Sequence, residues 1–105
     1  YVAMVQAMKW MKDQGLIDQL PVTGYVSAVS VGIVEGETLL DLCYTEDSQA
    51  KVDMNVVMTD RGEYIEIQGT GEESPFSKTE LLELLDLGSK GCSKLHEIQK
   101  ALLCE

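Results

Sequence analysis

Three aspartates, Asp41, Asp47 and Asp53, recur at intervals of six residues in the stretch LLDLCYTEDSQAKVDMNVV, which runs from Leu39 to Val57. Carboxylates that converge can hold a hard divalent cation such as Mg²⁺, or they can exchange a proton with a reacting group. The same spacing also fits three solvated or capping aspartates that accept hydrogen bonds from nearby backbone N–H groups. A calcium loop is excluded, because the stretch lacks the Asp-x-Asp-x-Asp-Gly run.

Two predicted β-hairpins surround these aspartates. The first pairs YVSAVSVGIV (25–34) with TLLDLCY (38–44) across the turn EGE (35–37), which places Asp41 in a strand on the same side as Leu39 and Cys43. Asp47 then falls in the connecting loop. The second hairpin pairs a strand that begins near Val52 with EYIEIQG (63–69). The carboxylates are therefore expected near one end of a sheet.

The strand from Val52 onward alternates between apolar and mostly polar residues, which predicts one buried face and one open face. The members of the two faces are Val52, Met54, Val56 and Met58 on the first, and Asp53, Asn55, Val57 and Thr59 on the second. Asp53 is thus expected on the face away from the core.

Helices are predicted at both ends of the chain. The first covers residues 1–14, where Tyr1, Met4, Val5, Met8 and Met11 form an apolar stripe and Gly15 is placed to cap the C-terminus. The last begins at Ser77, which forms a capping box with Glu80, and Phe76 and Leu81 hold the two positions of a hydrophobic staple. Its stripe consists of Leu81, Leu84, Leu85, Gly88, Cys92, Leu95 and Leu102. These patterns predict an α+β fold: a four-stranded sheet of two hairpins, packed by a C-terminal helix.

The composition limits the function of the chain. Eighteen acidic residues against eight basic ones give a net charge of −10 over 105 residues, which argues against electrostatic capture of nucleic acid by this chain alone. No apolar run approaches the length of about 20 residues that a membrane span requires. The three cysteines show no metal-ligand spacing, which favours reduced thiols, most of them buried, in a cytoplasmic protein.

Three further features suggest no chemistry of their own. GTGEES (69–74) lacks the Gly-Lys-Ser/Thr ending of a phosphate-binding loop. His96 is predicted on the surface of the last helix, without an acidic partner in its own segment. Cys43 is predicted in mid-strand, away from any helix start that would lower the pKa of its thiol.

Several local signatures together resemble the C-terminal half of the ribonuclease PH family, over nearly the whole chain. In order, they are AVSVGIV, LLDL-Y-ED, VDMNVVMT and IQGTGEE-PF, which leads into the Leu-rich helix. The resemblance implies a phosphate-dependent 3′→5′ exoribonuclease that trims the 3′ ends of transfer RNA precursors, releases nucleoside diphosphates and assembles as a hexameric ring.

The resemblance also implies roles for individual residues. The two active-site aspartates of the family fall on Asp41 and Asp47, whereas Asp53 begins a DMN segment that we interpret as mainly structural. We therefore expect Asp41 and Asp47 to be catalytic and to bind Mg²⁺, with inorganic phosphate as co-substrate. The cation suits this reaction because phosphate attacking a phosphodiester brings two anions together.

The resemblance has gaps. The family binds its attacking phosphate through a Gly-Thr-Arg segment and a further arginine, and neither has a counterpart here. We therefore expect residues 1–14 to be the terminal helix of an otherwise missing N-terminal subdomain, residues 15–105 to be the C-terminal subdomain, and the chain to be inactive without its other half. Cys43, Gln49 and Lys51 depart from the family motif and leave the number of metal ligands open.

Two alternatives come from other functional classes. One is a non-catalytic ring subunit that scaffolds an RNA-degrading assembly, against which the retention of both Asp41 and Asp47 argues. The other is a reduced-thiol redox module, which lacks a CxxC pair.

Overall fold

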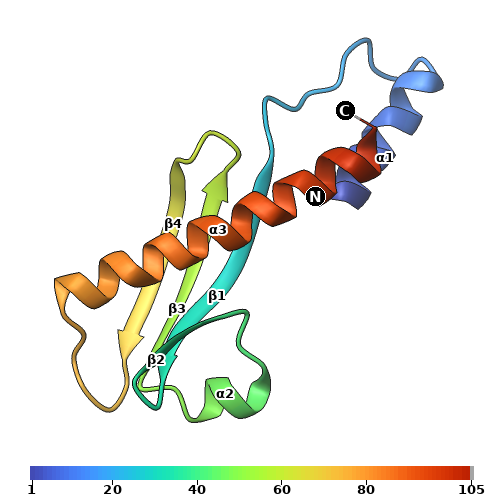
Figure 1. Ribbon diagram of the computed structural model, residues 1–105. Helices are drawn as coiled ribbons and strands as arrows, with labels where there is room; N and C mark the ends of the chain where they lie inside the picture. The colour runs from blue at the N-terminus through green and yellow to red at the C-terminus, as the bar shows by residue number, and fades with distance from the viewer. Residues whose placement is uncertain (105) are drawn as a thin grey trace.

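The computed structural model, in which residues 1–104 are described, is a four-stranded antiparallel sheet with one long helix along one face (Figure 1). The strands are β1 (Val26–Val34), β2 (Glu37–Leu40), β3 (Val52–Thr59) and β4 (Tyr64–Gly71), in the sheet order β2-β1-β3-β4. The helices are α1 (Val2–Asp13), α2 (Tyr44–Ser48) and α3 (Lys78–Leu103). The predicted α+β class, with two hairpins and a C-terminal helix, is confirmed.

The first hairpin closes through a two-residue turn. Glu35 and Gly36 have φ angles of 52° and 80°, and Val34 pairs with Glu37. Positive φ at both central positions is the mark of a type I′ turn, whose twist matches that of the paired strands. This turn sets the register of β2 and therefore the point at which the chain leaves the sheet.

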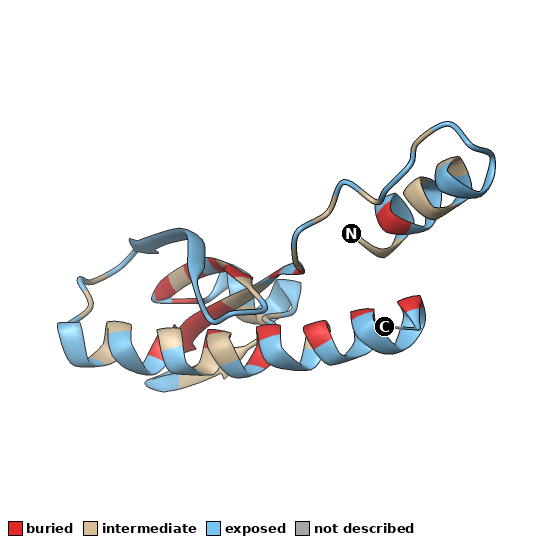
Figure 2. Cartoon of the chain, turned by 90° about the horizontal axis from the view of Figure 1, so that it is seen from above, coloured by how far each residue is buried: buried red, intermediate tan, exposed pale blue. Residues whose placement is uncertain are grey.

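The core lies between the sheet and α3, as the buried residues in Figure 2 show. Val52, Met54, Val56 and Met58 are all buried, so the predicted alternation of β3 is confirmed. At Gly88 the helix comes close to the sheet, because an added Cβ would lie 3.2 Å from Val56 Cγ2. One face of the sheet is thereby covered by α3.

The start of α3 agrees with the prediction. Ser77 Oγ accepts a hydrogen bond from the Glu80 N–H at 3.1 Å, and Glu80 Oε1 accepts one from the Ser77 N–H at 2.9 Å. Phe76 and Leu81 both pack against the core. The predicted stripe is wrong at its far end: Leu102 is 60% exposed, because Leu103 instead packs with Val5 and Tyr25.

Helix α1 lies beside the C-terminal end of α3, beyond the sheet (Figure 1). The Lys9 ammonium donates to Leu103 O at 2.6 Å, and the Tyr1 hydroxyl donates to Gly24 O at 2.6 Å. Gly15 caps the helix with a φ of 75°, as predicted. The methionine stripe is wrong as a core face, since Val5 is the only buried residue of α1 and Met4 is exposed.

The second strand is shorter than predicted. It ends at Leu40 rather than at residue 44, because Asp41 takes a left-handed conformation with φ 60°, which breaks the extended backbone. Residues Tyr44–Ser48 then form α2 rather than strand and loop. No helix among residues 1–104 is long and apolar enough to cross a membrane.

Candidate active site

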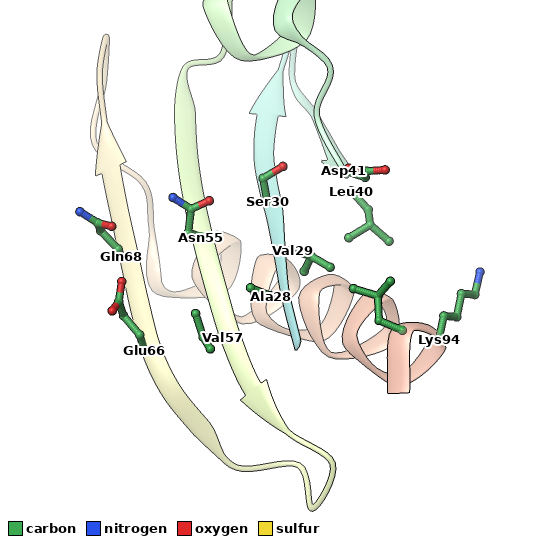
Figure 3. A pocket seen from close by; sticks show the side chains of 12 residues that line it. Ala28, Val29, Ser30, Leu40, Asp41, Asn55, Val57, Glu66, Gln68 and Lys94 are labelled. Atoms are coloured by element: carbon green, nitrogen blue, oxygen red, sulfur yellow. The ribbon is translucent and has the colours of Figure 1, made fainter. Parts of the chain in front are cut away.

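The face of the sheet opposite α3, which we call the open face, carries the polar side chains of β1, β3 and β4 (Figure 3). Two rows of directly paired residues cross it: Ser30, Asn55 and Gln68 in one row, and Gly32, Asp53 and Thr70 in the next. In the first row each side chain can donate or accept a hydrogen bond. These two rows therefore form a mostly polar strip of the open face, and strand register fixes their order.

Asp41 is held against this face by Ser30. The Asp41 N–H donates to Ser30 O at 2.7 Å, and the Leu42 N–H donates to Ser30 Oγ at 3.1 Å. Asp41 lines a groove of about 610 Å³ together with Ser30, Asn55 and Gln68 (Figure 3). A non-glycine residue at positive φ persists where its surroundings hold it, and Ser30 supplies two of those contacts.

Gly32 lies beneath the same segment. A Cβ added at this position would come within 2.7 Å of Leu42 Cδ1 and 2.5 Å of Val52 O. Leu42 follows Asp41, and Val52 precedes Asp53. The absence of a side chain at Gly32 thus allows Leu42, next to Asp41, to pack on β1, and it allows β3, which carries Asp53, to lie close to β1.

Asp47 lies in α2, not in a loop as predicted. The helix starts after Cys43, whose N–H donates to Glu46 Oε1 at 3.0 Å and whose carbonyl accepts from the Asp47 N–H at 2.8 Å. The Asp47 carbonyl in turn accepts from the N–H of the buried Ala50 at 3.2 Å. The backbone of Asp47 is held at two points while its side chain is exposed.

The carboxyl groups of Asp47 and Asp53 lie together. Partial burial raises the pKa of Asp53, and a side-chain hydrogen bond with Asp47 and the negative charges of Asp47 and Glu72 raise it further, whereas the Met54 backbone N–H lowers it. These acids repel one another when ionised, so a bound cation would relieve the repulsion.

This arrangement predicts how stability varies with pH in the absence of divalent ions. The folded state holds the Asp53 proton more tightly than the unfolded chain does. The free energy of unfolding therefore falls as pH rises from 3.8, the ordinary pKa of an aspartate side chain, through the raised pKa of Asp53. Asp53→Asn should therefore stabilise the protein at pH 7 but not below pH 3.8. Chemical denaturation of both proteins across this range, in chelator, checks the expectation. A stability difference that stays constant with pH would contradict it.

The donors on the open face suit a hard cation but do not form a complete cage. No three His, Cys, Asp or Glu side chains in the described part of the chain are grouped as a metal centre. Mg²⁺ usually takes only one or two protein carboxylates and keeps several waters, so two aspartates suffice for it. The donor set fits Mg²⁺ better than Zn²⁺, which prefers nitrogen and sulfur ligands.

The structure therefore rearranges the predicted site. It places Asp53, which the sequence suggested was mainly structural, beside Asp47, and it places Asp41 along the groove that Asn55 and Gln68 also line. Asn55 and Gln68 line a second, smaller polar pocket with Asp53 as well. Asn55 on β3 and Gln68 on β4 thus line both pockets, next to Ser30 on β1. Sequence reasoning missed them as site residues, although the alternation of β3 put Asn55 on the same face as Asp53.

Two other predicted placements are wrong. His96 is buried rather than on the helix surface: its Nε2 lies 3.3 Å from Ser27 Oγ and its Nδ1 lies 3.1 Å from Gln99 Oε1. This network ties α3 to β1 on the covered side of the sheet, so His96 is structural. Cys43 precedes α2 instead of lying in mid-strand, because the strand ends early.

All three cysteines are free thiols, but only one is buried as predicted. Cys92 lies in the core between α3 and the sheet. Cys43 and Cys104 are exposed, because each lies at the end of a helix instead of within a packed element.

Comparisons with known proteins agree with this fold. The model of the 3′ exoribonuclease family, domain 2, matches residues 24–91. Ribonuclease PH of Syntrophomonas wolfei subsp. wolfei is 53% identical over 103 residues, which cover 98% of this chain and 43% of the relative. Ribonuclease PH of Corynebacterium efficiens is 52% identical over 103 residues, which cover 98% of this chain and 42% of the relative. The chain thus spans less than half the length of these relatives.

A solved structure shows the same architecture. A chain of an archaeal exosome core superposes with a TM-score of 0.66 at 25% identity, over 77% of this chain and 32% of that chain. The family model matches well over half of this chain, and the curated relatives match nearly all of it. The resemblance to the ribonuclease PH family is confirmed, and the chain belongs to the 3′ exoribonuclease family, whose second domain it contains.

Proposed function

We propose that this chain supplies the acidic, metal-binding half of the active site of a phosphate-dependent 3′→5′ exoribonuclease. The observation that carries the proposal is the carboxylate cluster on the open face, where Asp47 pairs with Asp53 beside the groove of Asp41, in a member of the 3′ exoribonuclease family. The substrates would be the 3′ ends of transfer RNA precursors and the products nucleoside diphosphates. The ribonuclease PH relatives support this choice.

In the proposed reaction, an oxygen of inorganic phosphate attacks the phosphorus of the last phosphodiester. The bond from that phosphorus to the 3′ oxygen of the shortened RNA breaks, and the terminal nucleoside leaves as its diphosphate. The released 3′ oxygen must gain a proton. Asp47 is the stronger candidate to donate it or to hold the metal, with Asp41 as its partner, because the carboxyl group of Asp47 lies beside that of Asp53.

Asp41 and Asp47 would be the Mg²⁺ ligands. When bound, the cation neutralises charge on the two phosphates as they come together. The negative charges of Asp47 and Glu72 near Asp53 support a cation here, since they disfavour the ionised form of Asp53 when no cation is bound.

The phosphate and the RNA backbone also need positive groups, and a chain with a net charge of −10 has few to offer. We propose that the remainder of a longer enzyme supplies them, and that residues 1–14 form the last helix of its N-terminal, phosphate-binding subdomain. The chain would then be inactive by itself. We further propose a hexameric ring in the cytoplasm, where free thiols such as those of this chain stay reduced.

The experiment uses the complete enzyme, by which we mean the polypeptide of the relatives' length that contains this chain. A 3′-tailed transfer RNA precursor is incubated with Mg²⁺, with and without inorganic phosphate, and the released nucleotides are identified. We expect nucleoside diphosphates only when phosphate is present, and none after chelation of the metal. Nucleoside monophosphates released without phosphate would refute phosphorolysis. No release under any condition would favour the non-catalytic ring subunit.

A further inference from the structure

Tyr44 is the most exposed large hydrophobic side chain among residues 1–104, at 84%. An aromatic ring in water forgoes the free energy of burial, so an exposed one is informative when it lies beside a functional group. Tyr44 is the first residue of α2, three residues before Asp47. Nothing in the proposed reaction uses it.

The geometry of α2 places this ring next to the proposed catalytic carboxylate. Residues three apart on a helix are surface neighbours, with Cβ atoms about 5–6 Å apart. The hydrogen bonds of Cys43 to Glu46 and to Asp47 fix the turn that carries both Tyr44 and Asp47. The backbone of Tyr44 is thus fixed at the edge of the acidic site, and its ring is open to solvent.

The surroundings of Tyr44 are not those of a protein-docking patch. Its neighbours Cys43, Thr45 and Ser48 are exposed and lack large apolar side chains. Other exposed apolar residues, such as Ile65 and Ile67, lie on β4 at the far edge of the sheet from β2. Figure 1 shows α2 at the end of the sheet away from α1. Tyr44 therefore does not extend a larger hydrophobic surface.

We propose that Tyr44 is a stacking platform for a nucleobase near the 3′ end of the bound RNA. This inference rests on the proposed function and names the group that holds the base. Stacking needs no positive charge and accepts every base, because all bases have a π-face. It thus suits an acidic surface that must hold successive nucleotides without reading their sequence.

The test compares Tyr44→Ala, Tyr44→Leu and Tyr44→Phe in the complete enzyme. Binding of a 3′-labelled RNA is measured in chelator without phosphate, so that no turnover occurs. Loss of one base–aromatic contact, worth about 1–3 kcal/mol, should raise Kd roughly 5-fold to 150-fold for the Ala and Leu variants. The Phe variant should bind within about twofold of the wild type, because the ring remains.

A second readout separates stacking from phosphate contact. The slope of log Kd against log salt concentration should stay unchanged in all three variants, because Tyr44 neutralises no phosphate. Tyr64→Ala is the control, since Tyr64 is an exposed aromatic residue at the start of β4, paired with the end of β3 that lies away from α2. It should leave Kd unchanged.

The outcomes are distinct. Unchanged Kd in the Ala and Leu variants would overturn the stacking role. If Tyr44→Ala also had a lower melting temperature while binding RNA normally, Tyr44 would be a packing residue instead. Tyr44→Leu keeps most of the apolar volume, so a fold that needs only bulk at this position survives in it. Failure of the proposed function is seen separately, as missing phosphate-dependent release by the wild type.

Discussion

Asp47→Asn in the complete enzyme should lower turnover by roughly 10²–10⁴-fold, the usual effect of removing a positioned acid or base. The two side chains have nearly the same shape, and that of Asp47 is exposed, so the variant should fold normally. Removing one charge next to Asp53 also relieves repulsion. We therefore expect no decrease in melting temperature. Phosphate-dependent release of nucleoside diphosphate is the measurement.

Two further measurements distinguish the possible roles of Asp47. If it mainly holds the metal, the variant should need more Mg²⁺ for half-maximal activity, and excess Mg²⁺ should recover part of the rate. If it mainly donates a proton, the dependence of turnover on pH should lose the limb that reports a catalytic acid. Asp86→Asn, an exposed aspartate on α3, is the matched control and should leave both properties unchanged. Normal turnover in Asp47→Asn would refute both roles.

The layers of the fold could be predicted because each rests on a local pattern with a clear physical cause. The alternation of β3 requires one buried face, and the Ser77 capping box fixes the start of α3 through two hydrogen bonds. Such signals need no knowledge of distant contacts. The long-range packing was harder to predict: the burial of His96 depends on Ser27, which lies 69 residues away in the sequence.

The site itself was only partly predictable, for a similar reason. The sequence around Asp41 is typical of a strand, so it did not indicate that β2 ends at Leu40. That end depends on the left-handed backbone of Asp41, which is held by contacts with Ser30 on another strand. The pairing of Asp47 with Asp53 likewise follows from how α2 folds back toward β3, not from their spacing. Whether Asp41 and Asp47 share a cation stays a prediction.

Gly32→Ala should damage the site more than its small volume suggests. The added Cβ would lie 2.5 Å from Val52 O and 2.7 Å from Leu42 Cδ1, so either β3 or the segment after β2 must move. Overpacking of this kind costs about 1–3 kcal/mol of stability. Because Leu42 adjoins Asp41 and Val52 adjoins Asp53, the displacement reaches both aspartates. A shift of about 1 Å in a catalytic group can cost roughly 10²-fold in rate.

The matched control is Gly69→Ala, the same substitution in β4. Its Cβ would meet the flexible Met54 Cε at 2.7 Å, on the side of the sheet that faces α3. A methionine end can rotate away, whereas a backbone carbonyl cannot do so without moving its strand. Gly69→Ala should therefore keep turnover within a few fold, while Gly32→Ala, assayed well below its melting temperature, should lose most of it. Equal turnover in the two variants would show that the close approach at Gly32 does not position the aspartates, and their geometry would then have to be set by Ser30 and α2 alone.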